Sequence, residues 1–141
     1  PPWASQFLMI IQMEARWDGQ VRDVLMSALT GPNLHVKIAV AVDSDVDIYN
    51  AEDVLWAITC RTDPDQQVHI MPGSRLHPLD ISIPEVGDDY TVMRIGGKMA
   101  IDATKPATWR TKERHRFSRV DPMGKGDPAI EKILEQVRQA R

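Results

Sequence analysis

The sequence predicts an α/β fold, a layered domain in which helices flank a short, mainly parallel sheet. Short apolar segments of strand length occur at residues 6–13, 34–42 and 67–71. Segments with helical periodicity fill the intervals between them, and turn residues separate each segment from the next. This alternation predicts a β-α-β-α-β core with parallel strands and right-handed crossovers, followed by a C-terminal helix. At 141 residues, the chain has the length of one such domain.

The first strand and helix are predicted from composition and spacing. Residues 6–13 form an apolar run with the length of a buried strand. Asp18 and Gly19 open the helix that follows, and Gly31 and Pro32 end it. Its apolar side chains share one stripe, formed by Val21, Val24, Leu25, Ala28 and Leu29. The stripe predicts the face that this helix buries.

The second strand and helix carry clearer signals. Residues 34–42 are rich in β-branched residues and nearly continuous in apolar character, which is typical of a central strand covered on both faces. Asn50 is a favourable N-cap for a helix over residues 51–61, which has two acidic residues in its first turn. The turn at residues 62–65 ends this helix before the third strand. We expect its buried face to consist of Val54, Leu55 and Ile58.

The second half of the chain has a looser pattern. Residues 72–90 contain several prolines and glycines and predict a long connection of the kind that carries function. Strands are expected on either side of Gly96 and Gly97, and an irregular, basic segment over residues 104–126. A final helix begins at Pro128. Its apolar stripe consists of Ile130, Ile133, Leu134 and Val137.

Composition and charge limit the classes of function. With 43% hydrophobic and 26% charged residues, the chain has the composition of an ordered globular domain. Its net charge of -3 gives no general attraction to nucleic acid or anionic membranes, so we expect neither as a partner. No apolar run approaches the roughly 20 residues that span a bilayer. The single cysteine, Cys60, forms no internal disulfide, which favours the cytoplasm. Because Pro1 leads so directly into a strand, we expect a fragment or separate subunit of a longer protein.

Three aspartates alternate at Asp43, Asp45 and Asp47, directly after the second predicted strand. The spacing is typical of an EF-hand, but Ile48 and Val54 stand where that loop needs glycine and glutamate, which argues against calcium. Open α/β sheets bind ligands and partner domains at the carboxyl ends of parallel strands, so an interdomain contact is one interpretation. Aspartates that cap turns by accepting bonds from backbone amides are an equal alternative.

Other candidate sites are weaker. Gly96-Gly97-Lys98 is similar to part of a phosphate loop but lacks the rest of that motif, so a solvated lysine beside a turn is favoured. Cys60 lies within a predicted amphipathic helix and is interpreted as a small core residue. No cluster of His, Cys or Asp has metal-ligand spacing, and no Ser-His-Asp motif is present.

A basic segment extends from Lys105 to Arg119. It contains six positive charges against Glu113 alone, within a chain of net negative charge. Trp109 and Phe117 would suit base stacking, yet no nucleic-acid-binding module accompanies them. The favoured interpretation is a segment that is solvated or pairs with an acidic surface of a neighbouring subunit.

Three segments together resemble one family. They are "VDSDVDIYNAEDVLWAITCRTDPDQQVHIMPG", "SRLHPLD" and "GGKMAIDATKP", which follow one another in this order. They resemble the C-terminal part of UbiD-type decarboxylases, enzymes that use prenylated FMN. Each motif is modest alone, and the order of all of them over much of the chain carries the resemblance.

The resemblance implies a division of labour within a longer enzyme. Members interconvert aromatic or α,β-unsaturated carboxylic acids with CO2 and the decarboxylated product. The catalytic glutamate-arginine-glutamate set, and the metal ions that hold the cofactor phosphate, come from a central flavin-binding domain. Residues 1–141 are similar to the C-terminal α/β domain, which closes the active site and mediates oligomerisation. We therefore expect this chain to be inactive alone, to self-associate and to need a flavin-binding domain or subunit. A stand-alone binding or assembly module with the same fold is the alternative.

The resemblance assigns few individual residues. The loop that matches "LHPLD" supplies apolar side chains to the substrate pocket, which implies this role for His77, Pro78 and Leu79. A histidine in place of a large apolar residue implies a hydroxylated or otherwise polar substrate. Some relatives have a lysine for the cofactor phosphate where this chain has Gly31, so that contact is absent or supplied by another residue. Lys98 and Asp102 match the family pattern and are expected to be structural.

Overall fold

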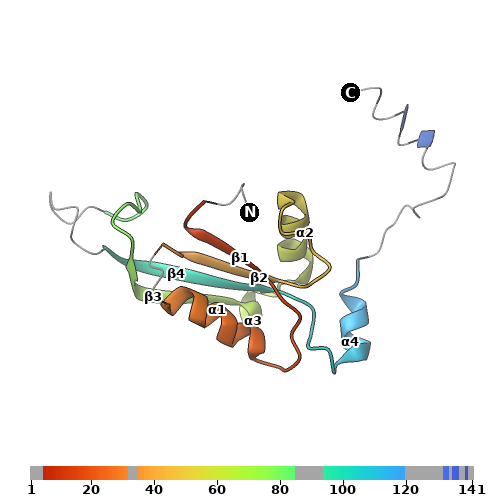
Figure 1. Ribbon diagram of the computed structural model, residues 1–141, viewed down its shortest axis with the longest axis horizontal. Helices are drawn as coiled ribbons and strands as arrows, with labels where there is room; N and C mark the ends of the chain where they lie inside the picture. Colours follow the sequence, from red (N-terminus) through yellow and green to blue (C-terminus); the bar gives the residue numbers. More distant parts are fainter. Residues whose placement is uncertain are drawn as a thin grey trace.

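The computed structural model describes residues 5–31, 35–84 and 94–119, and separate positions at 132, 133, 135, 136 and 139. One sheet of four strands, in the order β1-β2-β4-β3, is flanked by helices (Figure 1). The predicted α/β class is thereby confirmed. The elements are β1 (Leu8–Gln12), α1 (Gln20–Thr30), β2 (Ile38–Val42), α2 (Ala51–Arg61), α3 (Pro64–Gln67), β3 (Val68–Leu76), β4 (Arg94–Ala103) and α4 (Thr111–Arg116).

The sheet is mixed, which corrects one part of the prediction. Strands β1, β2 and β4 are parallel, whereas β3 pairs antiparallel with β4. The strand that lies parallel beside β2 is β4. The predicted third strand is present as β3, but its predicted parallel direction was wrong. A parallel crossover after β3 would usually contain a helix, and the sequence between Leu76 and Arg94 has no helical pattern. The chain instead turns back after Leu76 and enters β4 at Arg94, beside the strand that it has just left.

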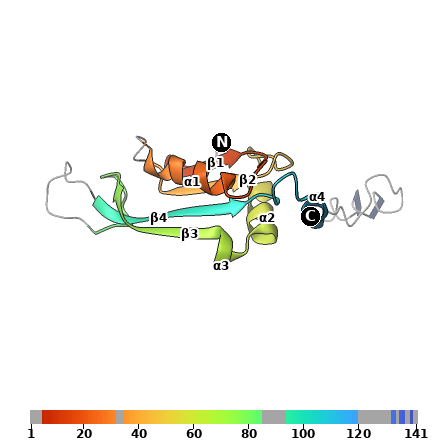
Figure 2. The ribbon, with the colours of Figure 1, turned by 90° about the horizontal axis from the view of Figure 1, so that it is seen from below.

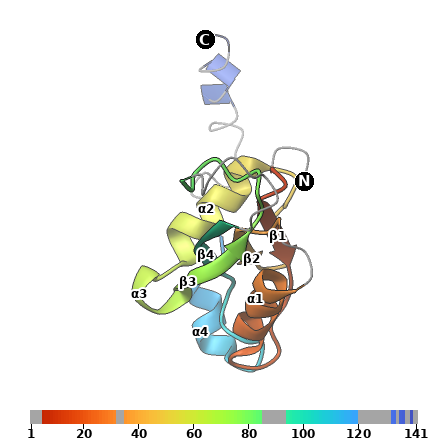
Figure 3. The same ribbon diagram turned by 90° about the vertical axis from the view of Figure 1, so that its left-hand side faces the viewer.

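The two long helices cover opposite faces of the sheet (Figure 3). On one face, Val21, Leu25 and Leu29 of α1 pack against the alanines of β2 and β4. On the other face, Val54 and Ala57 of α2 pack against Val40, Val42 and Ala103. The alternating sequence of β2 therefore places small residues beneath α1 and larger ones beneath α2.

Local predictions for the helices are largely confirmed. The buried stripe of α1 is as expected, and the Asn50 side chain caps α2 by accepting a hydrogen bond from the Glu52 amide at 3.0 Å. Leu55 was placed on the wrong face, because it is 59% exposed. It follows Val54 directly, and consecutive helical positions point about 100° apart. Cys60 is also exposed rather than in the core.

Strands β3 and β4 continue beyond the other two strands as a two-stranded arm (Figure 2). Two separate strands were predicted around Gly96 and Gly97, but β4 runs through both glycines. A Cβ atom at Gly96 would lie 2.7 Å from Leu76 Cδ1, so glycine permits close packing there. The predicted irregular segment after residue 104 contains α4, and the predicted C-terminal helix lies almost wholly outside the described residues. No helix in the described part of the chain is long and apolar enough to cross a membrane.

Candidate functional site

The loop that follows β3 brings His77 to the amino ends of β1 and β2. Its imidazole stacks on that of His35, with ring centroids 4.0 Å apart, and the Phe7 ring lies 6.4 Å away. Nδ1 of His77 accepts a hydrogen bond from the Leu79 amide at 3.2 Å. In the neutral imidazole this assigns the ring proton to Nε2, which then acts as a donor. The Leu79 side chain is 61% exposed.

This loop is fixed to the sheet through a buried carboxylate. Asp80 pairs with Lys37, which directly precedes β2, at 3.0 Å. The Ser82 hydroxyl and amide donate to Asp80 Oδ1 at 2.7 and 3.0 Å, and Arg94 Nη1 donates to the Asp80 carbonyl. Burial alone would raise the pKa of Asp80, but the hydrogen bonds and charge of Ser82 and Lys37 outweigh it and lower that pKa. The His77 loop is thus held by charged contacts on both sides.

The sequence predicted a functional connection after the third strand, but it did not predict which residues pack around that connection. His77, Pro78 and Leu79 follow β3 directly, but the predicted start of the connection at residue 72 was wrong, because β3 continues to Leu76. His35 was not singled out, because a histidine beside an apolar strand is usually a packing residue. Its contact with His77 joins residues 42 positions apart and has no local sequence signal. The role of the loop in a substrate pocket stays a prediction.

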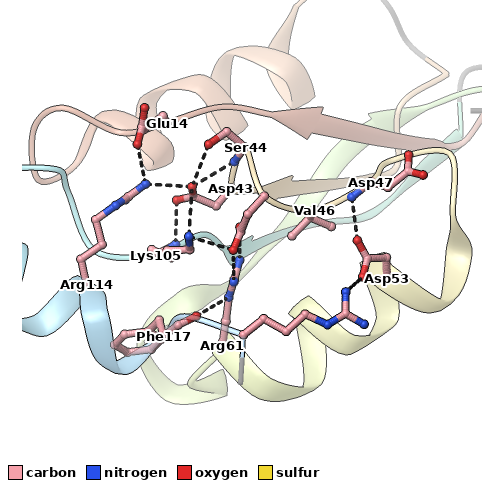
Figure 4. Close-up of polar contacts among 12 residues, drawn as sticks. Glu14, Asp43, Ser44, Val46, Asp47, Asp53, Arg61, Lys105, Arg114 and Phe117 are labelled. Atoms are coloured by element: carbon pink, nitrogen blue, oxygen red, sulfur yellow. Dashed lines mark hydrogen bonds and ion pairs between the residues drawn. The ribbon is translucent and has the colours of Figure 1, made fainter. Parts of the chain in front are cut away.

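At the opposite end of the parallel strands, the acidic turn, residues Asp43–Asp47, binds the basic segment of the same chain (Figure 4). Asp43 is completely buried. Its carboxylate accepts hydrogen bonds from the Ser44 amide at 2.9 Å, the Lys105 amide at 3.2 Å and Arg114 Nη2 at 2.8 Å. Asp43 therefore caps its own turn and also fixes α4 to the end of β2.

Asp45 forms a two-point ion pair with Arg61 at the end of α2. The paired atoms lie 2.9 and 2.7 Å apart, and Lys105 Nζ lies 2.8 Å from the same carboxylate. The Arg61 side chain is only 1% exposed, donates to the Phe117 carbonyl at 3.1 Å and lies over the Trp56 ring. Burial alone would raise the pKa of Asp45, but Arg61 and Lys105 outweigh it and lower that pKa to about 2.

Asp47 completes the turn with a different set of contacts. Its amide donates to Asp53 Oδ2 at 2.7 Å, and its exposed carboxylate accepts from the Tyr49 amide at 2.9 Å. Arg119 pairs with Asp53 on the other side. Because these cations are paired within the chain, the predicted pairing of the basic segment with a neighbouring subunit was wrong for Lys105, Arg114 and Arg119. The turn-capping interpretation fits Asp43 and Asp47, which accept hydrogen bonds from backbone amides, whereas Asp45 pairs with the side chains of Arg61 and Lys105.

Two further residues that the sequence singled out, Lys98 and Asp102, have structural roles in and after β4. Lys98 lies within β4 and is 4% exposed, so neither a phosphate loop nor a solvated lysine describes it. Its Nζ donates to the Leu29 carbonyl at 2.6 Å, and burial lowers its pKa. Asp102 caps the end of β4 by accepting from the Thr104 amide and hydroxyl at 2.9 and 2.7 Å. Within the described residues, no group of three or more His, Cys, Asp or Glu is arranged to hold a metal ion.

Comparison with known proteins decides the family. The model of the 3-octaprenyl-4-hydroxybenzoate carboxy-lyase C-terminal domain matches residues 1–103. The chain belongs to the UbiD C-terminal domain family. This UbiD domain is similar in structure to 3,4-dihydroxybenzoic acid decarboxylase (AroY) of Klebsiella pneumoniae, at 32% identity and a TM-score of 0.66 over 91% of the chain. The UbiD-class enzyme HmfF of Pelotomaculum thermopropionicum, in complex with FMN, gives 28% identity and a TM-score of 0.63 over 90% of the chain.

Two further relatives extend the comparison. Vanillic acid decarboxylase of Sedimentibacter hydroxybenzoicus, in its closed form, gives 30% identity and a TM-score of 0.63 over 92% of the chain. An uncharacterized protein of Archaeoglobus fulgidus is 36% identical over 104 residues, or 73% of the chain. The UbiD domain described here spans 20% of the length of that protein and 25–26% of the three solved chains.

Proposed function

We propose that this UbiD domain is the C-terminal part, or a separate subunit, of a carboxy-lyase for aromatic or α,β-unsaturated carboxylic acids. In this role it closes the active site and contributes to oligomerisation, and it is inactive without its flavin-binding partner. The observation that carries the proposal is the His77 loop, a turn that charged contacts hold at one sheet edge while its Leu79 side chain remains exposed. Such a turn suits a wall of a pocket that a second domain completes.

The residues of the loop have separate roles in this proposal. His77 donates a hydrogen bond from Nε2 to an oxygen of the substrate ring, because its Nδ1 is engaged by the Leu79 amide. Leu79 provides apolar contact and Pro78 fixes the turn between them. AroY is a decarboxylase of 3,4-dihydroxybenzoic acid, which supports a hydroxylated aromatic acid as the substrate here.

The cofactor belongs mainly to the missing partner in this proposal. HmfF is bound to FMN in its solved structure, which supports a flavin for the assembled enzyme. Prenylated FMN would supply the electron-accepting chemistry for loss of CO2. The residues of this chain would orient the ring of the substrate and exclude water from it, while metal ions would be held by the flavin-binding domain.

Closing and self-association have independent support. Vanillic acid decarboxylase, which is similar to this chain, has been solved in open and closed forms. Large apolar side chains are exposed on β3, on β4 and in the loop that follows β3, namely Ile70, Ile95, Leu79 and Ile81. Large exposed apolar areas are typical of interaction surfaces. These features support docking of this domain against other parts of the enzyme.

The proposal is tested in the enzyme assembled with its flavin-binding domain, by replacing His77 with leucine. We expect kcat/KM for 3,4-dihydroxybenzoate to fall roughly 10- to 100-fold, since a hydrogen bond in a desolvated pocket contributes about 1–3 kcal/mol. For an unsubstituted aromatic acid, kcat/KM should fall much less. The matched control is His115→Leu, because His115 is an exposed histidine on α4. Equal losses for both substrates, or no loss for either, would contradict the assignment. Failure of the chain to associate with any flavin-binding domain would favour an assembly module.

A further inference from the structure

A cavity of about 480 Å³ lies beside the last turn of α1, against the arm formed by β3 and β4. Such a volume is in the range of small-molecule sites and exceeds the needs of a single water or ion. The residues that line it include Thr30, Gly31, Met71, Ser74, Arg75 and Lys98. None of the described lining residues carries a carboxylate, whereas two of them are cationic.

The decisive residue is Lys98, which is buried and has no counter-charge among the residues that the structure describes. Its ammonium group has three donors, and within the described chain its acceptor is the Leu29 carbonyl, at 2.6 Å. No described carboxylate lies within ion-pairing distance of its Nζ. A buried cation is expensive unless it is paired and its remaining donors are satisfied. The lowered pKa of Lys98, which burial causes, agrees with that deficit.

An irregularity in the sheet forms one wall of the cavity. Met71 pairs with Lys98 and Ser74 pairs with Gly96, so Pro72 and Gly73 together oppose Gly97 and form a bulge with one additional residue in β3. Gly73 has a φ of 67°, a conformation that favours glycine. Bulges often occur beside functional sites, where they redirect side chains. Here the bulge lies between Met71 and Ser74, which both line the cavity together with Lys98.

A purely structural role accounts for only part of this arrangement. Helix α1 has no basic residue in its last turn, and Lys98 supplies a cation to the carbonyls there. That contact uses one donor, however, and explains neither the two remaining donors nor a cavity whose described lining residues include no acidic side chain. We propose that this cavity binds a small ligand through an oxyanion, a phosphate or carboxylate group, which pairs with the Lys98 ammonium group. Arg75 lines the same cavity.

The test is a titration of the 141-residue chain with lysine side chains labelled with ¹³C at Cε. Inorganic phosphate and acetate are added separately at pH 8, with sodium chloride adjusted to keep ionic strength constant. We expect a saturable shift of the Lys98 signal, a higher Lys98 pKa and a rise in Tm of several degrees at saturation with at least one of these anions. A response to phosphate alone identifies a phosphate site, and a response to acetate alone identifies a carboxylate site.

Variants separate the proposed site from general salt effects. Lys98→Met should abolish the saturable Tm rise, whereas Lys112→Met, at an exposed position on α4, should retain it. Lys98→Arg keeps the charge and should retain part of the response if Lys98→Met fails to fold. The proposal is overturned if Lys98 of the wild-type chain shows no saturable shift with either anion. The proposal is also overturned if chloride raises the Tm of the wild-type chain as much as phosphate or acetate does, or if these anions raise the Tm of Lys98→Met equally.

Discussion

Replacing Asp45 with asparagine should destabilise the domain by about 2 kcal/mol at pH 7. The carboxylate titrates with a pKa of about 2 in the folded chain against an ordinary value of 3.8. That difference corresponds to at most roughly 2.4 kcal/mol, at about 1.36 kcal/mol for each pKa unit. The Asp45 side chain is 33% exposed, so solvent screening reduces the figure to about 1–2 kcal/mol. The loss of a charged partner for the buried Arg61 adds to it.

The effect should depend on pH in a defined direction. Because the pKa of Asp45 is lowered by folding, its contribution is fully present above the unfolded value of 3.8 and is lost as the pH falls towards 2. Urea unfolding, followed by tryptophan fluorescence, measures both quantities. The difference between wild type and Asp45→Asn should be largest at pH 5–7 and should shrink steadily below pH 4.

A matched control is available within the acidic turn. The Asp47 carboxylate is exposed and accepts a hydrogen bond from a backbone amide of its own turn, so Asp47→Asn should change stability by less than about 0.5 kcal/mol. The reasoning fails if Asp45→Asn lies within about 0.5 kcal/mol of wild type at pH 7. It also fails if the difference between the two persists unchanged at pH 3.

Two further predictions concern β4. Gly96→Ala should cost about 1–3 kcal/mol in urea unfolding, because its new Cβ would lie 2.5 Å from Ile83 Cδ1 and force that side chain to move. Gly97→Ala, with nothing within 4 Å of its Cβ, should be nearly neutral, and equal costs would contradict this explanation. Since burial lowers the pKa of Lys98 from 10.5, the unfolded chain binds this proton more tightly, so stability should rise with pH towards 10.5. The Lys98→Met variant should lack this rise, which is measured as the change in Tm from pH 7 to 10. The same dependence of Tm on pH in the wild-type and variant chains would refute the prediction.

Features with local causes could be predicted from the sequence. The Asn50 cap and the apolar stripe of α1 depend on residues within one or two helical turns, and both were found as expected. The direction of β3 depends on the connection after Leu76, which carried no helical pattern to exclude a hairpin. The sequence therefore predicted the layers of the fold better than the pairing within the sheet.

The candidate sites show the same division. The acidic turn and the basic segment were both recognised as charged stretches, but their mutual pairing joins residues such as Asp43 and Arg114, 71 positions apart. The burial of Lys98 depends on the packing of α1 against β4, and neither segment alone indicates it. The contact of His35 with His77 likewise exists only once the loop has returned to the start of β2.

The arm gives the His77 loop a mechanical property that the rest of the sheet lacks. Beyond the amino end of β2, β4 pairs with β3 alone. A two-stranded ribbon twists more easily than a sheet with both faces covered. The Lys37–Asp80 ion pair is one of the contacts that tie this ribbon back to the body of the domain. Lys37 is partly exposed, so added salt weakens this pair while leaving the apolar core intact. We therefore expect added salt to loosen one of the contacts that hold the loop, while the apolar core beneath it keeps its packing.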